Sequence, residues 1–357
     1  MSSIAPVRIG IIGTGGIANA HAMAYQRAGG VEIVGCADIV PGRATAFAER
    51  WGIPRAFTSH QELLALDELD AVSVCTFNQA HRQPTVDALE AGKHVLVEKP
   101  LAARLEDAVA MISAAHGSGR ILHTGFWQRF QPEVQAARRM VESGALGELY
   151  YAQMVGGGRR RIPGGSFLKR DFAGAGPVVH IGCYDLDTFM FLAGGPRPVS
   201  VSAMVSERLG RALPNVPGDW GHDPSQVEVE DFGTAFVRFE SGLVLHFVTY
   251  WAAHAEDLGP SLLLGTAGGL QLRPRLTLYR DEFGVLTNVT PQIPDNTEPH
   301  RMHHFVPQAM VFTAAVRAGG PAPVELREVL YSQVIMDGMF RSAAAGREVA
   351  VEIPAVG

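Results

Sequence analysis

The chain has 357 residues, of which 47% are hydrophobic and 18% are charged, with a formal net charge of −6. This length exceeds what one hydrophobic core usually supports, so two domains are expected. No apolar run approaches a membrane span, and the negative charge gives no bulk attraction for nucleic acid or anionic membrane. The start, MSSIAPVRIG, lacks the features of a secretory signal, and the cysteines show no CxxC spacing. We therefore expect a cytoplasmic protein without a disulfide framework.

Residues 1–124 alternate between two kinds of pattern. Short runs typical of strands are VRIGIIG, VEIVGCAD, AVSVCTF, HVLVEKP and RILHTGF. Amphipathic stretches of helix length separate them. The pattern predicts a Rossmann domain, an α/β fold with a doubly wound parallel sheet.

From residue 125 onward the pattern changes. A predicted helix over 132–147 precedes runs of strand character at 150–157, 198–207, 229–240, 242–254, 261–272 and 275–281. ESG and TAGG are typical of hairpin turns between neighbouring strands. The second domain, 125–357, is therefore predicted to be α+β with a mainly antiparallel open sheet. Its last helix, about 326–345, is expected to pack back on the first domain.

A dinucleotide signal lies in VRIGIIGTGGIA. Glycines of a G-x-G-x-x-A pattern follow the first predicted strand, and a helix opens at once. The first glycine makes the turn, the second admits a pyrophosphate, and the small third residue permits close packing of helix on strand. The expected cofactor contacts in this loop are Gly13, Gly15, Gly16, Ile17 and Ala18.

Asp38 ends the second predicted strand. A carboxylate at this position accepts hydrogen bonds from the adenosine ribose and repels a 2′-phosphate, so NAD is favoured over NADP. Arg43 could favour NADP if it reached the ribose, but we expect it to be a solvated charge of the next helix.

Several ordered motifs identify a family resemblance. HVLVEKPLA contains Glu98-Lys99-Pro100, preceded by CTFNQAH and followed by GFWQRFQPEVQAARRMVESGALGELYYAQ, VEDFGTAFVRFESG and LLGTAGGLQL. Together with the glycine pattern they resemble the Gfo/Idh/MocA oxidoreductases. The resemblance implies a Rossmann domain and a substrate domain whose open sheet often forms the oligomer interface. It also implies NAD(P)-dependent oxidation or reduction of sugars, cyclitols and related alcohols.

The resemblance assigns further residues to the active site. Lys99 matches the catalytic lysine of the family, whose ammonium can stabilise negative charge on a substrate oxygen. Its bond to Pro100 is expected to be cis. Asn78 and His81 lie where the family contacts the nicotinamide ribose and the substrate edge, and Glu98 is grouped with these cofactor contacts.

The segment GAGPVVHIGCYDLD corresponds to the third motif of the family, with two changes. His180 takes the usual aspartate position and Tyr184 the usual histidine position, whereas Asp187 matches and is expected to orient neighbours. Tyr184 is predicted to exchange a proton, its pKa lowered by Lys99 and by the positive charge of the cofactor. The alternative is a buried tyrosine with a structural hydrogen bond.

His180 admits four interpretations. It could relay a proton, bind a substrate hydroxyl, act as the base itself, or be a satisfied core histidine. Arg170 resembles a basic residue that often precedes the third motif and contacts substrate. Arg159–Arg161 could bind an acidic group but are more typical of a solvated loop. His300, His303 and His304 do not form a standard zinc pattern, so no metal is expected.

The sequence thus predicts an NAD-dependent dehydrogenase. Hydride would pass between nicotinamide C4 and a secondary alcohol or ketone of a sugar, sugar derivative or cyclitol, with Lys99, Tyr184 and His180 at the substrate oxygen. A homodimer or homotetramer is expected to form through the C-terminal sheet. The alternatives are an enzyme that cleaves glycosides through transient oxidation by NAD and a non-catalytic regulator that binds NAD and a metabolite.

Overall fold

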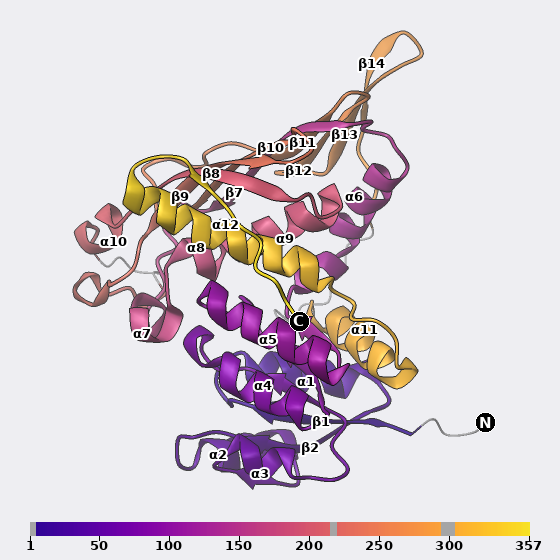
Figure 1. Cartoon of the computed structure of the whole chain (residues 1–357), viewed down its shortest axis with the longest axis vertical. Helices are drawn as coiled ribbons and strands as arrows, with labels where there is room; N and C mark the ends of the chain where they lie inside the picture. Colours follow the sequence, from indigo (N-terminus) through magenta and orange to yellow (C-terminus); the bar gives the residue numbers. More distant parts are fainter. Residues whose placement is uncertain (1–4, 215–219, 294–303) are drawn as a thin grey trace.

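The computed structural model of the chain describes residues 5–214, 220–293 and 304–357. Two sheets lie at opposite ends of the molecule, with a layer of helices between them (Figure 1). In the described part of the chain, every helix is too short or too polar to cross a bilayer.

The first sheet has six parallel strands in the order β3-β2-β1-β4-β5-β6. They are β1 (Val7–Ile12), β2 (Val31–Ala37), β3 (Ala56–Phe57), β4 (Ala71–Val74), β5 (His94–Val97) and β6 (Leu122–Thr124). The connecting helices are α1 (Ala18–Ala28), α2 (Arg43–Trp51), α3 (His60–Leu64), η1 (Asn78–Ala80), α4 (Arg82–Glu90) and α5 (Leu105–Ser118). Because helices cover both faces, the central strands are mostly apolar, as in VRIGII of β1 and AVSV of β4. This is the predicted Rossmann fold.

The second sheet has nine strands in the order β14-β13-β12-β11-β7-β10-β9-β8-β15. They are β7 (Leu149–Gly157), β8 (Pro198–Ser206), β9 (Phe232–Phe239), β10 (Val244–Tyr250), β11 (Ser261–Gly265), β12 (Gly269–Arg273), β13 (Thr277–Glu282), β14 (Val285–Val289) and β15 (Val349–Ala350). The β7–β10 pair is parallel and the other neighbours are antiparallel. The mainly antiparallel sheet is therefore confirmed.

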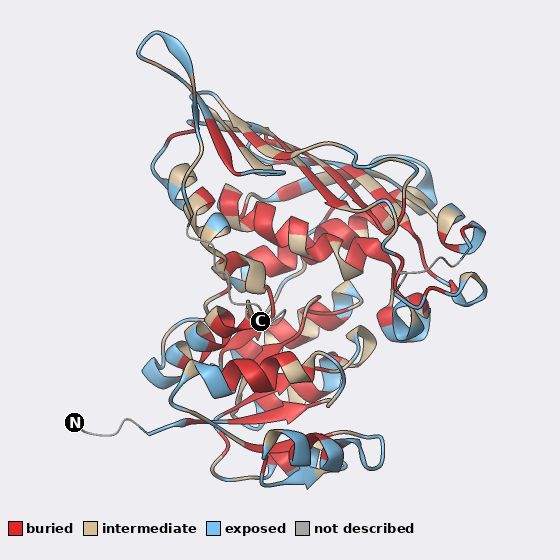
Figure 2. Cartoon of the chain, turned by 180° about the vertical axis from the view of Figure 1, so that it is seen from behind, coloured by how far each residue is buried: buried red, intermediate tan, exposed pale blue. Residues whose placement is uncertain are grey.

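One face of the second sheet packs on helices. Its strands alternate, so that Ala152, Leu245 and Val237 are buried while their neighbours face away from the helices. The remaining helices are η2 (Trp127–Phe130), α6 (Pro132–Glu142), η3 (Gly165–Leu168), α7 (Arg170–Ala173), α8 (Pro177–His180), α9 (Gly182–Ala193), α10 (Arg208–Ala212), η4 (Pro224–Gln226), α11 (Phe305–Ala318) and α12 (Leu326–Ala345). Figure 2 shows that buried residues dominate the helices between the two sheets.

Two C-terminal helices return to the first domain. Helix α12 lies between the second sheet and α5, and Gln333 Nε2 donates to the Ala102 carbonyl at 3.1 Å. Helix α11 packs on α1, with Phe305 and Phe312 in one core with Ile9 of β1. From the sequence, only the last helix was expected to pack back on the first domain, and α11 was not predicted.

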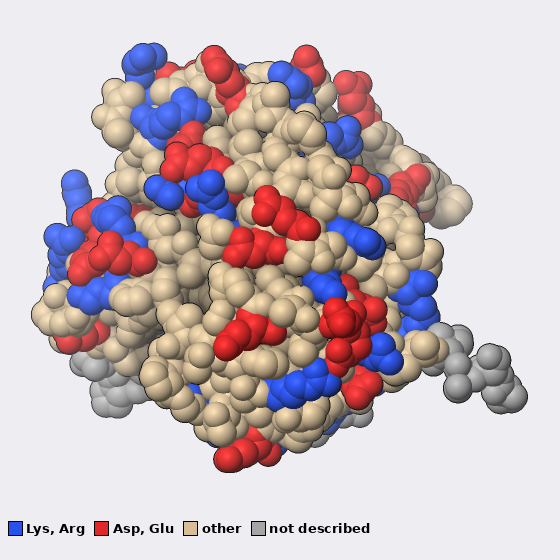
Figure 3. Space-filling view, turned by 60° about the horizontal axis from the view of Figure 1, so that its bottom comes forward, with Lys and Arg blue, Asp and Glu red and all other residues tan. Residues whose placement is uncertain are grey.

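The face seen from the Rossmann end carries both signs of charge. In Figure 3, the acidic and basic side chains intermingle on this face, between larger uncharged areas. Neighbouring pairs include Arg82 with Asp107, at 3.1 Å, and Arg104 with Asp107, also at 3.1 Å.

Candidate active site

The glycine loop leaves an open surface in front of α1. Gly13 has φ +83°, and a Cβ there would lie 2.9 Å from the carbonyl of Cys75, so this turn requires glycine. A Cβ on Gly15 or Gly16 would meet nothing within 4 Å. Helix α1 begins at Ala18, directly after this open backbone. A diphosphate can therefore approach the loop and the N-terminal end of the helix.

Asp38 connects this loop to the end of β2. Its Oδ2 accepts hydrogen bonds from the N–H and the hydroxyl of Thr14, both at 2.9 Å, and its Oδ1 accepts from the Val40 N–H at 2.9 Å. Asp38 and Arg43 both line a cavity of about 570 Å³ that also touches the glycine loop. Arg43 is the first residue of α2 and is exposed, as expected, but it also lines the same cavity as Asp38.

A second cavity of about 460 Å³ begins at Gly15 and Gly16; we call it the lysine cavity. Lys99, His180 and Tyr184 line it together. They come from the end of β5, the end of α8 and the first turn of α9. The fold thus brings together the three residues that the sequence analysis selected as catalytic.

The third-motif segment holds Lys99 in place. Lys99 Nζ donates to the His180 carbonyl at 2.9 Å and lies 4.8 Å from the centroid of the Tyr184 ring. The Lys99–Pro100 peptide bond is cis, as the resemblance implied. The ammonium therefore lies at the wall shared by the two domains.

The environment of Tyr184 differs from the expectation. Burial, followed by the charges of Glu98 and Cys183, raises the pKa of Tyr184 well above its usual value. The prediction that Lys99 lowers this pKa is wrong, because the ammonium lies over the ring while the hydroxyl accepts the Trp127 Nε1–H at 2.9 Å. At neutral pH the phenol keeps its proton and is a hydrogen-bond donor.

His180 is a neutral ring held in one orientation. Burial and then the charge of Lys99 lower its pKa well below the usual value. The Trp251 Nε1–H points to His180 Nδ1 at 3.3 Å, and Phe167 packs on the ring with a centroid separation of 4.4 Å. Because an indole N–H can only donate, Nδ1 is the acceptor and the ring proton is on Nε2. Among the described residues nothing accepts from that Nε2–H, and His180 lines the lysine cavity.

Behind Lys99 lies a buried network that was not predicted from the sequence. Glu98 Oε1 lies 2.8 Å from His21 Nε2, and Glu98 Oε2 accepts the Lys99 N–H at 3.2 Å. His21 Nδ1 contacts Ser73 Oγ at 3.1 Å, and Tyr25 contacts the same oxygen at 2.6 Å. Burial opposes charge on both partners. Against it, Cys75 and then Glu98 raise the pKa of His21 to about 10, whereas His21 and then Lys99 lower the pKa of Glu98.

One signal for this network was present in the sequence. The stretch HAMAY places two polar rings, His21 and Tyr25, four residues apart in a small apolar helix. Positions i and i+4 share a helix face, so a common buried partner could have been expected. That this common partner is Ser73, and that His21 also reaches Glu98, depends on the packing of α1 against the sheet, which the sequence does not display.

Two other predicted site residues have different surroundings. Asn78 lines the lysine cavity, and its Nδ2 donates to the Ala173 carbonyl at 2.9 Å. His81 is fully buried, with Nδ1 at 3.0 Å from the Pro100 carbonyl and Nε2 at 3.2 Å from the Thr76 carbonyl. Its ring supports the turn after Lys99 and has no exposed surface toward a cofactor.

Arg170 lies on the surface at the start of α7. Its guanidinium donates to the Glu228 carbonyl and lies 3.7 Å from Glu207 Oε1. Its side chain is 57% exposed, and the lining of the lysine cavity includes Phe172 and Ala173 but not Arg170. We therefore do not retain Arg170 as a substrate contact.

Asp187 takes part in a buried ion cluster. Arg129 makes two hydrogen bonds to it, at 2.8 and 2.6 Å, and one to Glu328 at 2.6 Å. Burial raises the pKa of Asp187 to about 6 against the opposing effect of Arg129. The cluster joins η2, α9 and α12, which agrees with the expected orienting role.

The histidine-rich segment is only partly described. His300 and His303 lie outside the described residues, and His304 packs on Trp127 with ring centroids 3.9 Å apart. Among the residues that the structure describes, no group of three or more His, Cys, Asp or Glu side chains could hold a metal ion.

Comparisons with known proteins agree with this architecture. A model of the oxidoreductase family with an NAD-binding Rossmann fold matches residues 7–126, and a model of the GFO/IDH/MocA C-terminal domain matches 134–271. D-glucoside 3-dehydrogenase of Escherichia coli (strain K12) is 31% identical over 96% of this chain and 97% of that protein. 1,5-anhydro-D-fructose reductase of Ensifer adhaerens is 28% identical over 97% and 98%.

A solved structure of levoglucosan dehydrogenase in complex with NADH has the same fold. Its TM-score is 0.82 at 22% identity, over 98% of this chain and 100% of that one. The sequence likeness and the two domain matches confirm the predicted family and its NAD-binding domain. The chain is therefore an oxidoreductase that belongs to the Gfo/Idh/MocA family.

Proposed function

We propose that this enzyme is an NAD-dependent dehydrogenase for a secondary alcohol of a sugar, sugar derivative or cyclitol. The observation that carries the proposal is the convergence of Lys99, His180 and Tyr184 on a cavity that begins at the glycine loop. These side chains provide three groups that can hydrogen-bond one substrate oxygen. The two curated relatives named above act, by their names, on a glucoside and on an anhydro sugar.

The chain offers suitable contacts for the cofactor. Gly15 and Gly16 present open backbone to the diphosphate, Asp38 lines the cavity proposed for the adenosine ribose, and Asn78 lines the cavity proposed for the nicotinamide end. When bound, NAD supplies the hydride acceptor at C4, and NADH the donor.

The protein groups manage charge and proton at the substrate oxygen. In reduction, Tyr184 would give its proton to the substrate oxygen as the bound cofactor supplied hydride to the carbonyl carbon, and in oxidation the phenolate would take the proton back. The raised pKa of Tyr184 suits the reductive direction, because the phenol is protonated at neutral pH. Lys99 stabilises the developing negative charge, and the Nε2–H of His180 orients the same oxygen or its neighbour.

A substrate screen tests this function. The purified protein is incubated with sugars, glycosides, cyclitols and their keto forms, with NAD(H) or NADP(H), and the absorbance of the reduced cofactor is followed. We expect turnover with NAD(H) and a sugar-like compound. Activity with NADP(H) alone would contradict the role given to Asp38. Glycoside cleavage without net NADH formation, or tight binding of both ligands without turnover, would contradict the dehydrogenase proposal.

We further propose that the enzyme works in the cytoplasm as a homodimer or homotetramer. Cys36, Cys75 and Cys183 are buried free thiols, which suits a reducing compartment. The face of the second sheet turned away from the helices carries exposed apolar side chains, among them Met204 and Phe236. A second copy placed on that face would cover them.

A further inference from the structure

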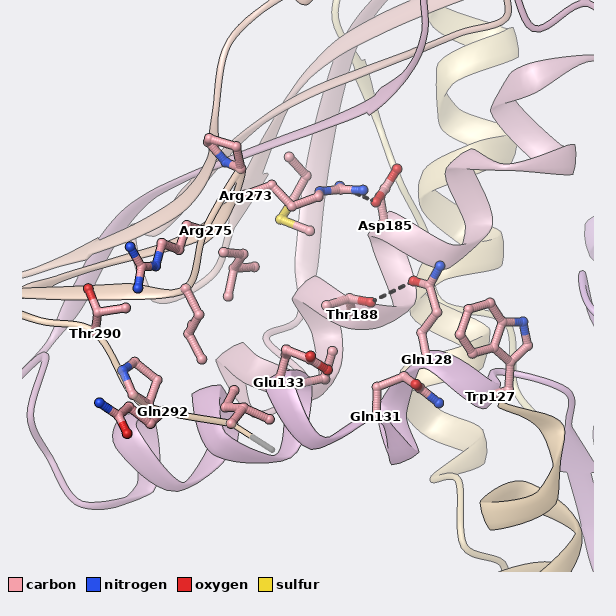
Figure 4. A pocket seen from close by; sticks show the side chains of 17 residues that line it. Trp127, Gln128, Gln131, Glu133, Asp185, Thr188, Arg273, Arg275, Thr290 and Gln292 are labelled. Atoms are coloured by element: carbon pink, nitrogen blue, oxygen red, sulfur yellow. Dashed lines mark hydrogen bonds and ion pairs between the residues drawn. The ribbon is translucent and has the colours of Figure 1, made fainter. Parts of the chain in front are cut away.

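A third cavity lies in the second domain, and we call it the Trp127 cavity. It has a volume of about 710 Å³ and is bounded by η2, α6, α9 and the turn from β12 to β13 (Figure 4). Val134, Met154 and Leu272 contribute apolar wall. It is larger than the lysine cavity and can hold a ring-sized ligand.

One side of the Trp127 cavity combines an indole with side-chain amides. Thr188 Oγ1 donates to Gln128 Oε1 at 3.4 Å. Because that oxygen is already engaged, the N–H groups of Gln128 remain for a ligand, and no described residue accepts from them. An aromatic face beside amide donors is suited to a sugar ring, which presents C–H groups on one face and hydroxyls at its edge.

Another part of the lining carries a guanidinium held by a buried carboxylate (Figure 4). Arg273 Nη2 donates to Asp185 Oδ1 and to Ser261 Oγ. Asp185 is 5% exposed, whereas the Arg273 side chain is 49% exposed, so the pair presents its donor end outward. Arg275 lies beside it in the lining (Figure 4).

The charges that line this cavity balance. Glu133 and Asp185 are acidic, and Arg273 and Arg275 are basic. Balanced charge gives no net attraction for a phosphate or a free carboxylate, whereas both signs can hydrogen-bond hydroxyl groups. The lining therefore favours a neutral ligand with many hydroxyls.

The Trp127 cavity adjoins the proposed catalytic site. Tyr184 and Asp185 are consecutive in α9, but Tyr184 lines the lysine cavity and Asp185 lines the Trp127 cavity. Trp127 lines the latter, and its Nε1–H donates to the Tyr184 hydroxyl at 2.9 Å. The hydrogen-bonded Trp127–Tyr184 pair thus lies between the two cavities.

We infer that the Trp127 cavity is a second sugar subsite, so that the substrate is a glycoside rather than a free monosaccharide. The ring to be oxidised or reduced lies at Lys99, and the neutral sugar attached to it occupies the Trp127 cavity. This inference rests on the proposed dehydrogenase function.

The test compares a monosaccharide with neutral disaccharides that contain the same reacting ring. kcat/KM is measured for the wild type, for the double variant Gln128→Ala/Arg275→Ala, and for Arg139→Ala, an exposed α6 position outside the cavity. We expect the wild type to favour a disaccharide by about tenfold or more, the gain from one or two added hydrogen bonds. The double variant should lose this preference while keeping its monosaccharide activity, and Arg139→Ala should behave as the wild type.

Two results overturn the inference. One is turnover of the monosaccharide without any disaccharide preference in the wild type. The other is a double variant that slows both substrates equally. In either case the dehydrogenase function stands. Absence of turnover with every sugar and both cofactors would instead overturn the proposed function, and this inference with it.

Discussion

Tyr184 and His180 line the lysine cavity as neutral side chains. Burial is the main cause, since it raises the pKa of Tyr184 and lowers that of His180, so that both have a proton to donate near pH 7. The partners that fix their orientation, Trp127 and Trp251, lie far away in the sequence, so their role could not be inferred from the motif.

Because the proton proposed for transfer belongs to Tyr184, removing its hydroxyl should lower the rate of the chemical step. Tyr184→Phe should lower kcat for ketone reduction by about a hundredfold, the usual range for removing a general acid. Trp127→Phe is the matched control, since it removes the indole N–H but keeps the phenol. It should lower kcat much less. Steady-state kinetics with NADH decide between them. Equal losses in the two variants would contradict the assignment.

His21 is expected to act through Glu98 as a positioning residue. In His21→Asn the buried carboxylate loses its charged partner, so the pKa of Glu98 should rise and the acid limb of the kcat/KM profile should move to higher pH. Tyr25→Phe leaves the His21–Glu98 contact intact and should keep the wild-type profile. A uniform loss of activity in His21→Asn, with an unchanged profile shape, would indicate a purely structural role.

Glu230 connects the third motif to β9 and predicts a pH effect on stability. Its Oε1 accepts the Val178 N–H at 3.2 Å, and burial raises its pKa from 4.5 to about 7. The folded state therefore retains this proton where the unfolded chain has lost it. The contribution of the protonated group to stability is complete below pH 4.5 and is lost as the pH rises through about 7.

Glu230→Gln keeps an acceptor but cannot ionise. Its free energy of unfolding, relative to that of the wild type, should therefore rise by about 3 kcal/mol between these two pH values. Urea unfolding at several pH values measures this difference. A difference that stays constant with pH would contradict the buried, titrating carboxyl.

The alternation of strand-like and helix-like runs in the sequence predicted most of the helices and strands of the fold. The strands of the first sheet fall within the predicted runs except β3, which has only two residues, Ala56–Phe57. In the second sheet, TAGG separates β11 from β12 as a hairpin turn, as predicted. The hairpin strand β14, Val285–Val289, was missed because its solvated residues show no clear apolar alternation.

Helix α11 shows where sequence patterns are insufficient. Phe305–Ala318 is apolar on several sides, and its partner α1 lies almost the whole chain away in the sequence. The Rossmann domain therefore obtains part of its core from the C-terminal region. Local periodicity predicts that a helix forms, but it carries no information on which distant element that helix contacts.

For the whole molecule, the open sheet face predicts association. Phe236 and Met204 are 39% and 50% exposed on neighbouring strands, and Figure 1 shows the helices on the other side of the sheet. Phe236→Asp/Met204→Asp should convert the proposed oligomer to monomer, because charges would then face each other across the interface. Light scattering measures the molecular mass in solution and so distinguishes monomer from oligomer. Leu286→Asp, on the hairpin tip, is the control for a general loss of solubility.

The central claim is that Lys99 acts at the oxygen of a sugar-like substrate while NAD(H) carries the hydride. The most direct measurement is the rate of NADH formation or consumption by the wild type and by Lys99→Met on a substrate found by the screen, with NADH binding measured in parallel. The account predicts a loss of at least about a hundredfold in kcat with NADH affinity unchanged. Turnover by Lys99→Met within a few-fold of the wild type would contradict it.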